Sequence, residues 1–182
     1  MNKERVMIFI DGSNFYHNTK KLKNKGYSIN FNKLVNKLSE NRTLSNSFYY
    51  TALLDKDYNL NQYDKHQRFI NELRKIPSFS VVLCDLIKIK SKEGKFIYEI
   101  KGDDVHLAHD LLIGAFEDLY DVVIIVSGDA DFIPVIKTIR KKYGKKIGNG
   151  YFRSSSSYKL RQVCNFSINM YKIINEIIDK QK

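Results

Sequence analysis

The stretch VVIIVSGDADF, residues 122–132, decides the fold class of this chain. Its five branched apolar residues run without interruption into a short polar motif that contains Asp129. A run that is apolar throughout, rather than alternating, is typical of a parallel strand covered on both faces. The N-terminal stretch RVMIFIDGSNF, residues 5–15, repeats the pattern and ends on Asp11. We therefore expect two buried parallel strands, each with an aspartate at its carboxyl end.

Apolar runs and helical spacings alternate along the rest of the chain. Further strands are predicted at 48–54, 80–87 and 145–152. Helices are predicted at 31–38, 61–76, 104–118, 132–142 and 168–180, the last as a closing helix. Strands that alternate with helices indicate an α/β sandwich, and a length of 182 residues suits one domain spanning 1–182.

One segment, residues 87–102, breaks this alternation with a period of two around a central Glu-Gly pair. This pattern predicts a β-hairpin inserted between a strand and a helix. The outgoing arm would carry three lysines on one face: Lys88, Lys90 and Lys92. The returning arm ends at Lys101, directly before an acidic pair, so the hairpin lysines are candidate contacts for nucleic acid.

The formal net charge is +11, because 31 Lys and Arg outnumber 20 Asp and Glu. This excess favours an anionic partner, most simply nucleic acid, although a solubilising lysine surface would give the same total. Arg153, next to a run of four serines, is a further candidate for phosphate contact.

The two cysteines, Cys84 and Cys164, are far apart and form no CxxC motif. We expect both to be reduced, buried thiols, which places the protein in the cytoplasm. No apolar run approaches the roughly 18 residues of a membrane span, so no membrane partner is expected. The N-terminal apolar run is short and meets Asp11, which favours a first strand over a signal peptide.

Ligands of open α/β sheets bind beyond the carboxyl ends of the strands, where Asp11 and Asp129 are predicted to lie. Asp103 and Asp104 open the helix that follows the hairpin. Two carboxylates about 4 Å apart repel by roughly 1 kcal/mol in water and by about 4 kcal/mol at an effective dielectric constant of 20. Converging acids therefore favour a divalent cation, and oxygen ligands suit Mg²⁺ or Mn²⁺.

Neighbouring polar residues have two interpretations each. Asp131 is either a second metal ligand or the N-cap of the helix at 132–142, and Asp103 is explained by capping of its own helix. Asn14 either orients a ligand or water, or only forms the turn after the first strand. Asp110 is interpreted as a supporting acid, because it points about 240° around the helix from Asp104.

Three motifs carry a family resemblance: IDGSN at 10–14, KGDD at 101–104 with LA and DL following at 107–111, and SGDADF at 127–132. In this order and spacing they resemble the NYN domain family, in the LabA-like (DUF88) branch of the PIN-domain-like nucleases. The resemblance covers nearly the whole chain. It implies a three-layer α/β/α sandwich with a mainly parallel central sheet, and a Mg²⁺- or Mn²⁺-dependent ribonuclease.

By motif position, the resemblance implies that Asp11, Asp104 and Asp129 bind the metal, with Asn14 and Asp131 in support. Asn165 departs from the family, whose members often carry an aspartate near this position, before the closing strand. This departure removes a peripheral acid and leaves the central set intact.

The sequence therefore favours a metal-dependent endoribonuclease, with a non-catalytic RNA-binding or regulatory module as the alternative. A metal-dependent adhesion domain is disfavoured, because Phe15 stands where its ion site needs a serine. A haloacid-dehalogenase-type phosphatase would need an acid where Ser13 stands. The oligomeric state is left open, with a homodimer as one option.

Overall fold

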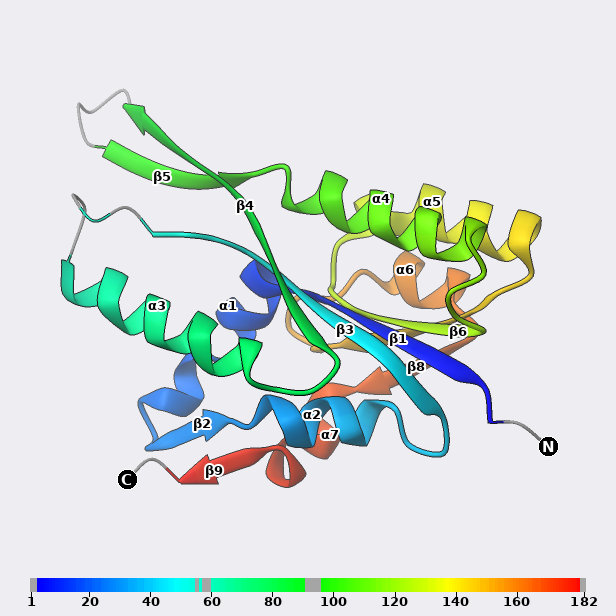
Figure 1. Ribbon diagram of the computed structural model, residues 1–182, viewed down its shortest axis with the longest axis horizontal. Helices are drawn as coiled ribbons and strands as arrows, with labels where there is room; N and C mark the ends of the chain where they lie inside the picture. Colours follow the sequence, from blue (N-terminus) through cyan, green and yellow to red (C-terminus); the bar gives the residue numbers. More distant parts are fainter. Residues whose placement is uncertain (1–2, 55, 57–59, 91–95, 181–182) are drawn as a thin grey trace.

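The computed structural model describes residues 3–54, 56, 60–90 and 96–180. Its centre is a seven-stranded sheet in the order β5-β4-β3-β1-β6-β7-β8, shown in Figure 1. The strands are β1 (Arg5–Asp11), β3 (Thr43–Ala52), β4 (Phe79–Lys90), β5 (Phe96–Lys101), β6 (Val122–Val126), β7 (Lys146–Tyr151) and β8 (Phe166–Asn169). Neighbouring strands are parallel except β4 and β5, which are antiparallel.

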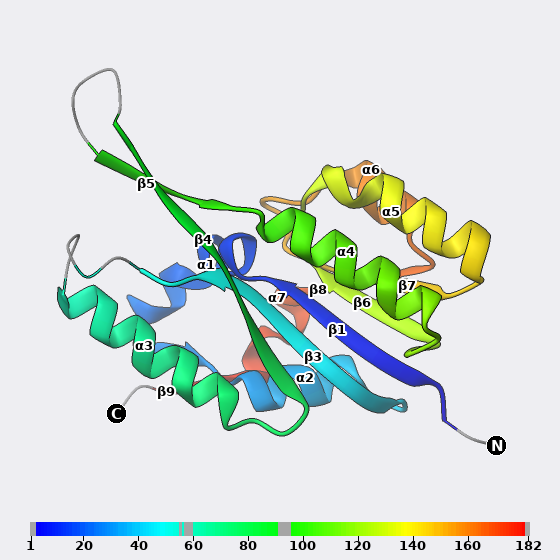
Figure 2. The same cartoon turned by 45° about the horizontal axis from the view of Figure 1, so that its top comes forward.

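Helices cover both faces of this sheet, as the two views in Figures 1 and 2 show. One face carries α1 (Gly12–Lys23), α2 (Phe31–Leu38), α3 (Leu60–Arg74) and α7 (Met170–Ile173). The other carries α4 (Asp103–Phe116), α5 (Ile133–Thr138) with the π-helical turn η2 (Ile139–Tyr143), and α6 (Tyr158–Val163). The expected three-layer α/β/α sandwich with a mainly parallel sheet is confirmed.

Strand β6 is buried along its whole length. Alternate residues serve the two layers: Ile124 packs into the core under α1, α2 and α7, and Ile125 into the core under α4 and α5. Neighbouring strand β1 divides its residues in the same way, with Ile8 in the first core and Phe9 in the second. Burial on both faces explains why these runs contain no polar alternation.

The helix expected at 168–180 is wrong. Instead, the segment divides into the end of β8, α7, the 3₁₀ turn η3 (Ile174–Glu176) and β9 (Ile178–Lys180). Strand β9 pairs antiparallel with β2 (Tyr27–Ile29) in a small second sheet, and Ile177 accepts a hydrogen bond from the Asn30 N–H. The isoleucine spacing fits a helix, but pairing with β2 outweighs this weak local preference.

Two further differences concern helices. Helix α1 was not expected, and it carries mainly polar residues with few buried apolar side chains, chiefly Phe15. The helix expected at 132–142 exists as a series of shorter turns, beginning with the 3₁₀ turn η1 (Ala130–Phe132) and continuing through α5 and η2.

The predicted hairpin is confirmed as β4 and β5, which project from the body of the molecule (Figures 1 and 2). Its predicted turn, with Lys92, lies outside the described residues. Both cysteines are free and buried, as expected. Within the described part of the chain, no helix is long and apolar enough to cross a membrane.

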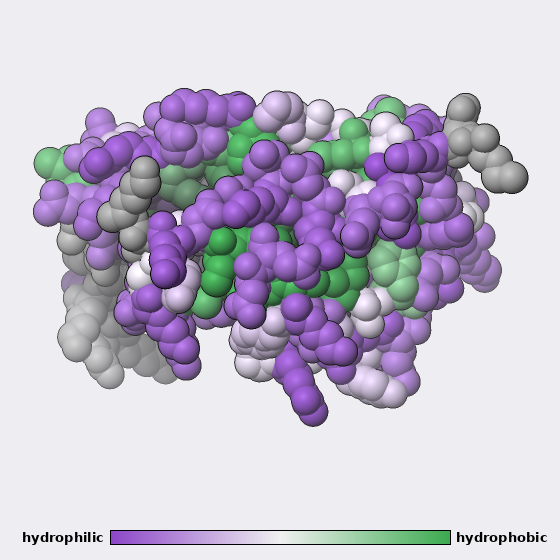
Figure 3. Space-filling view, turned by 90° about the horizontal axis from the view of Figure 1, so that it is seen from below, coloured by the Kyte–Doolittle hydropathy of each residue, from purple (hydrophilic) through white to green (hydrophobic). Residues whose placement is uncertain are grey.

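Hydrophilic residues dominate the face seen in Figure 3, the underside of the view in Figure 1, around a central hydrophobic area. Among the charged residues of α2, Lys33 pairs with Asp179 and Lys37 pairs with Glu176. Many cations are thus already balanced by local carboxylates. The total charge alone therefore does not locate the surface that binds an anionic partner.

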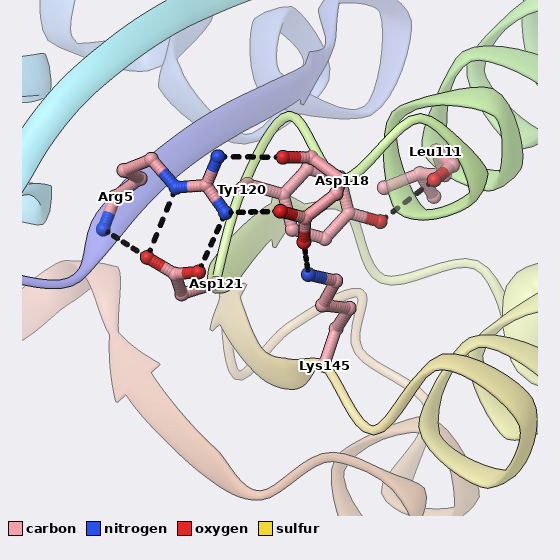
Figure 4. A network of polar contacts seen from close by, with 6 residues as sticks. All are labelled: Arg5, Leu111, Asp118, Tyr120, Asp121 and Lys145. Carbon is pink, nitrogen blue, oxygen red and sulfur yellow. Dashed lines mark hydrogen bonds and ion pairs between the residues drawn. The ribbon is translucent and has the colours of Figure 1, made fainter.

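The first residue of β1, Arg5, ties the amino end of the sheet to the loop between α4 and β6 (Figure 4). Its guanidinium donates to both Asp121 oxygens, at 2.8 and 3.2 Å, and to Asp118, which also pairs with Lys145. Hydrogen bonds from the Arg5 side chain and backbone lower the pKa of Asp121 to about 2.

Asp121→Asn should therefore lower the free energy of unfolding at pH 7 by about 1 kcal/mol. A pKa fall of this size corresponds to about 2.6 kcal/mol, but the Asp121 side chain is 39% exposed, so solvent screens much of it. Because the folded pKa lies below the unfolded value, the contribution is present above pH 4 and is lost as the pH falls through about 2.

Urea unfolding of both proteins between pH 2 and 7 measures this difference. Glu117→Gln, at an exposed position nearby, is the matched control. A constant stability difference across this range would contradict the electrostatic explanation.

Candidate functional site

The carboxyl end of the sheet holds a pocket of about 240 Å³, formed where β1, β6 and the start of α4 meet. Four carboxylates and five other polar side chains line it: Asp11, Asp103, Asp104 and Asp129, with Ser13, Asn14, His17, Asn18 and Ser155. A larger hollow, about 350 Å³, lies elsewhere and includes two ion pairs, Lys37–Glu40 and Arg42–Glu4. The lining of the 240 Å³ pocket has four carboxylates and no lysine or arginine. In the larger hollow, the two acids are paired with two basic residues.

Asp11 is the last residue of β1 and is buried, with 7% of its surface exposed. One carboxylate oxygen accepts the Asn14 N–H at 2.9 Å and so caps α1, and the other accepts the Ser127 hydroxyl at 2.8 Å. Burial nevertheless raises its pKa, and the charges of Asp103 and Asp129 raise it further. The carboxylate is held rigidly in an environment that disfavours its charge.

Asp129 follows β6 and is joined to Asp11 through Ser127. The Asp129 N–H donates to the Ser127 hydroxyl oxygen at 3.1 Å, and that hydroxyl donates to Asp11. The Asp129 Oδ1 atom accepts the Asp131 N–H at 2.8 Å and caps η1. The capping role suggested for Asp131 therefore belongs to Asp129. Asp131 is exposed and does not line the pocket.

Asp103 and Asp104 come from the first turn of α4. The chain leaves the hairpin through Gly102, whose φ of +80° is a conformation that glycine adopts without strain. No side chain caps this helix, so Asp103 does not serve as a cap, but it lies in the first turn, where a negative charge interacts favourably with the helix dipole. Burial raises the pKa of Asp104 to about 6, and the charges of Asp103, Asp11, Asp129 and Asp131 contribute in that order.

Helix α1 supplies two pocket residues that sequence reasoning missed, His17 and Asn18. They follow Asn14 by three and four positions, the spacing at which helical side chains share a face. Recognising α1 as a helix that begins at the Asp11 cap would have identified them.

The serine loop, residues 154–157, contributes Ser155 to the lining of the pocket. The Asn18 amide donates to the Ser155 hydroxyl at 2.7 Å and accepts from the Ser154 hydroxyl at 3.0 Å. A Cβ on Gly128 would lie 2.0 Å from the Ser155 carbonyl oxygen, and the Ser157 N–H donates to the Gly128 carbonyl at 2.9 Å. The loop thus packs directly on the backbone that leads into Asp129.

The remaining predicted residues lie outside this pocket. Lys88, Lys90, Lys101 and Arg153 are all exposed, and none of them lines it. Asp110, expected as a supporting or structural acid, accepts the Tyr50 hydroxyl at 2.9 Å and does not line the pocket. Asn165 accepts the Ile147 N–H at 2.9 Å, a contact between β7 and the segment before β8.

The donor set fits a hydrated Mg²⁺ or Mn²⁺ ion better than a metal enclosed by protein ligands. Within the described residues, no three acidic, histidine or cysteine side chains converge on one point. This arrangement is unlike a structural zinc site, which needs four such ligands. Mg²⁺ usually keeps several waters and binds one or two carboxylates together with substrate phosphates. An acidic pocket in which burial and neighbouring carboxylates raise the pKa values of Asp11 and Asp104 meets that requirement.

Comparison with known proteins agrees with this geometry. The family model of the NYN domain matches residues 5–171, nearly the whole chain. The chain belongs to the NYN domain family. Membership implies a PIN-like, nuclease-type fold, and the observed sheet and its helical layers are consistent with it.

The NYN domain is also similar to a crystal structure of a protein of unknown function from Vibrio parahaemolyticus. The two share 22% sequence identity with a TM-score of 0.72, over 98% of each chain. This similarity supports the fold. Among curated proteins, no significant match was found.

Asn18→Ala should loosen the serine loop, because it removes the hydrogen bonds to Ser154 and Ser155. We expect faster hydrogen exchange at the Ser155 and Ser157 amides and a loss of about 1 to 2 kcal/mol in unfolding free energy. Exchange followed by NMR measures this, with Lys20→Ala on an exposed position of the same helix as control. Unchanged exchange at both amides would show that Asn18 does not hold the loop.

Asp104→Asn should stabilise the metal-free domain at pH 7 by about 1 kcal/mol, since it removes one of four mutually repelling charges. The pKa of Asp104 in the folded protein, about 6, lies above its ordinary value of 3.8. Its contribution to stability is therefore full below pH 4 and is lost as the pH rises through about 6.

Thermal unfolding in EDTA at pH 4 and pH 7 measures this gain, which should appear only at pH 7. Asp64→Asn, at an exposed position on α3, is the control. A variant less stable than wild type at pH 7 would mean that repulsion does not dominate the pocket.

Proposed function

We propose that this NYN domain is a metal-dependent ribonuclease of the LabA-like (DUF88) branch, which hydrolyses RNA phosphodiester bonds at the acidic pocket. One observation carries the proposal: three separate elements deliver four carboxylates to one pocket in a chain of net charge +11. The buried free thiols of Cys84 and Cys164 support a reducing, cytoplasmic location.

Asp104 and Asp129, with Asp11 behind them, would hold Mg²⁺ or Mn²⁺, and Asp131 at the margin would add to the local negative charge. When bound, the metal would activate water and neutralise charge on the phosphate. The protein's own contribution is to position the carboxylates. Ser127 fixes Asp11 and Asp129 relative to each other, and the Asn14 N–H orients Asp11.

The unpaired carboxylates also explain why a cation must accompany the substrate. A pocket lined by four acids repels a phosphodiester, which is itself an anion. A bound divalent cation would turn this local repulsion of phosphate into attraction. Exposed basic residues outside the pocket would then bind the other phosphates of the RNA. The candidates for this role are four exposed residues: Lys88, Lys90, Lys101 and Arg153.

Cleavage of a labelled RNA with Mg²⁺ or Mn²⁺ tests the proposal directly. Asp129→Asn should reduce the rate by about 100-fold or more, since loss of groups that only orient a metal ligand already costs about 10- to 100-fold. EDTA should abolish cleavage, and the exposed Asp64→Asn variant should retain it. Equal cleavage rates for wild type and Asp129→Asn would contradict the proposed ribonuclease function.

The alternative function is a module that binds RNA without cutting it. The observation in its favour is that both Asp11 oxygens are already engaged by protein donors, with its pKa raised. Such a module would bind RNA equally well in EDTA and in Mg²⁺, and would show no turnover with either metal.

A further inference from the structure

Helix α1 joins the acidic pocket to an exposed surface of the molecule. It begins directly after β1, as Figures 1 and 2 show. Its first two turns supply four residues to the pocket lining: Ser13, Asn14, His17 and Asn18. The buried residues of the helix include Phe15 and Thr19, which lie on the side opposite His17. The face of α1 that carries His17 is therefore turned away from the core of the sheet.

The pocket-lining face of α1 continues into two exposed lysines. Lys20 and Lys21 follow His17 by three and four positions, the spacing at which helical side chains are neighbours on one face. Tyr16 lies four positions before Lys20 and is 58% exposed. The side chains of His17, Lys20 and Lys21 are exposed as well. We call these four residues, Tyr16, His17, Lys20 and Lys21, the basic face of α1.

The positive charge of this face is not balanced by carboxylates. Residues 12–26 contain four lysines and no aspartate or glutamate. Within the part of the chain that the structure describes, none of these lysines forms an ion pair. In α2, which lies in the same layer, the two lysines are paired with Asp179 and Glu176. The basic face of α1 therefore keeps its charge next to a pocket of opposite sign.

The composition of the basic face favours nucleic acid over a protein partner. Lysine is depleted at the centres of protein interfaces, whereas its ammonium group binds phosphates without regard to sequence. Tyr16 is the one large hydrophobic side chain that α1 exposes, and all residues of α1 are described. Its ring meets the His17 ring edge to face, with centroids 5.8 Å apart. Exposed aromatic rings beside cations are the features that bind the bases and the backbone of a single strand.

The basic face lies within a few nucleotides of the pocket. At about 1.5 Å of rise per residue, Lys21 lies about 10 Å along the helix axis from Asn14, which lines the pocket. One strand of a duplex carries a phosphate about every 3.4 Å of its axis, so this distance corresponds to about three nucleotides. A strand with one phosphate in the pocket can therefore reach both lysines without a long intervening segment.

We infer that the basic face of α1 binds the backbone of single-stranded RNA about three nucleotides from the scissile bond, where Tyr16 stacks on a base. The inference rests on the proposed action of the pocket on RNA. The pocket's carboxylates repel phosphate until a cation is bound, whereas the neighbouring lysines attract the strand with or without the cation. Part of the RNA affinity is therefore independent of the metal.

Binding of a fluorescein-labelled single-stranded RNA of about 12 nucleotides tests the basic face without requiring cleavage. Anisotropy is measured in EDTA from about 50 to 200 mM salt. The double variant Lys20→Ala/Lys21→Ala should bind about 10-fold more weakly than wild type. Its slope of log K against log salt should be shallower by about 1.4, which is about 0.7 for each of two lost contacts on a single strand.

The matched control is Lys141→Ala/Lys142→Ala, which removes the same two charges from exposed adjacent positions of η2. This turn comes just before β7, at the amino end of the sheet and so at the end opposite the pocket. The control should change the affinity less than twofold and leave the salt slope unaltered. Thermal unfolding checks that both pairs of exposed substitutions leave the fold intact.

Two further measurements separate the contributions of stacking and of chemistry. Tyr16→Ala should bind the RNA about 5-fold more weakly with an unchanged salt slope, because stacking on a base releases no counterions. In Mn²⁺, Lys20→Ala/Lys21→Ala should raise the KM for the same RNA about 10-fold and leave kcat within twofold. Contacts made equally in the ground state and the transition state affect KM alone.

The possible results separate the basic face from the ribonuclease activity. Wild-type affinity and salt slope in Lys20→Ala/Lys21→Ala, or an equal loss in the control, would overturn the inference even if the domain cleaves RNA. Tighter binding of a labelled poly-glutamate peptide than of the RNA would also overturn it, since the face would then fit an acidic protein segment. A shallower slope confined to Lys20→Ala/Lys21→Ala would support the inference even if no RNA is cut, and the absence of cleavage would then count against the proposed activity alone.

Discussion

Parallel pairing between β1 and β6 is the constraint on which the acidic pocket depends. The register places Ile10 beside Val126, so the two strands end together, and the polar residues that follow both lie at one edge of the sheet. Alternate side chains of both strands pack into two different cores, so a slip of either strand by one residue would move each side chain into the wrong core. The separation of Asp11 and Asp129 is therefore set by core packing.

The pocket contains carboxylates without a basic partner, whereas elsewhere in the molecule carboxylates are paired with basic residues. At the amino end of the sheet, Asp121 is held by Arg5 and its pKa is lowered. At the carboxyl end, the pKa values of Asp11 and Asp104 are raised by burial and by neighbouring carboxylates. Aspartate thus stabilises the amino end of the sheet through an ion pair, whereas at the carboxyl end burial and repulsion between carboxylates destabilise the charged aspartates. Such unfavourable electrostatics are expected at a ligand site, because a bound ligand can offset them.

The sequence was sufficient for the parts of the fold that depend on uninterrupted apolar runs. Strands β1 and β6 and the aspartates after them could be predicted because burial on both faces leaves a clear pattern. Helix α1 could not, because it packs mainly through Phe15 and its remaining surface is polar. The isoleucines of 168–180 led to a wrong helix prediction because their spacing fits a helix. The pairing of β9 with β2 joins segments far apart in the sequence and cannot be inferred from local spacing.

Asp129 occupies a position with two demands on one atom. Its Oδ1 accepts the N–H that starts η1, the first turn of the series that continues into α5. A cation that recruits this oxygen competes directly with the helix for the same lone pairs, while a cation that uses Oδ2 leaves the turn undisturbed. An ion bound through Oδ1 would therefore be linked thermodynamically to the order of η1, whereas an ion bound through Oδ2 would not.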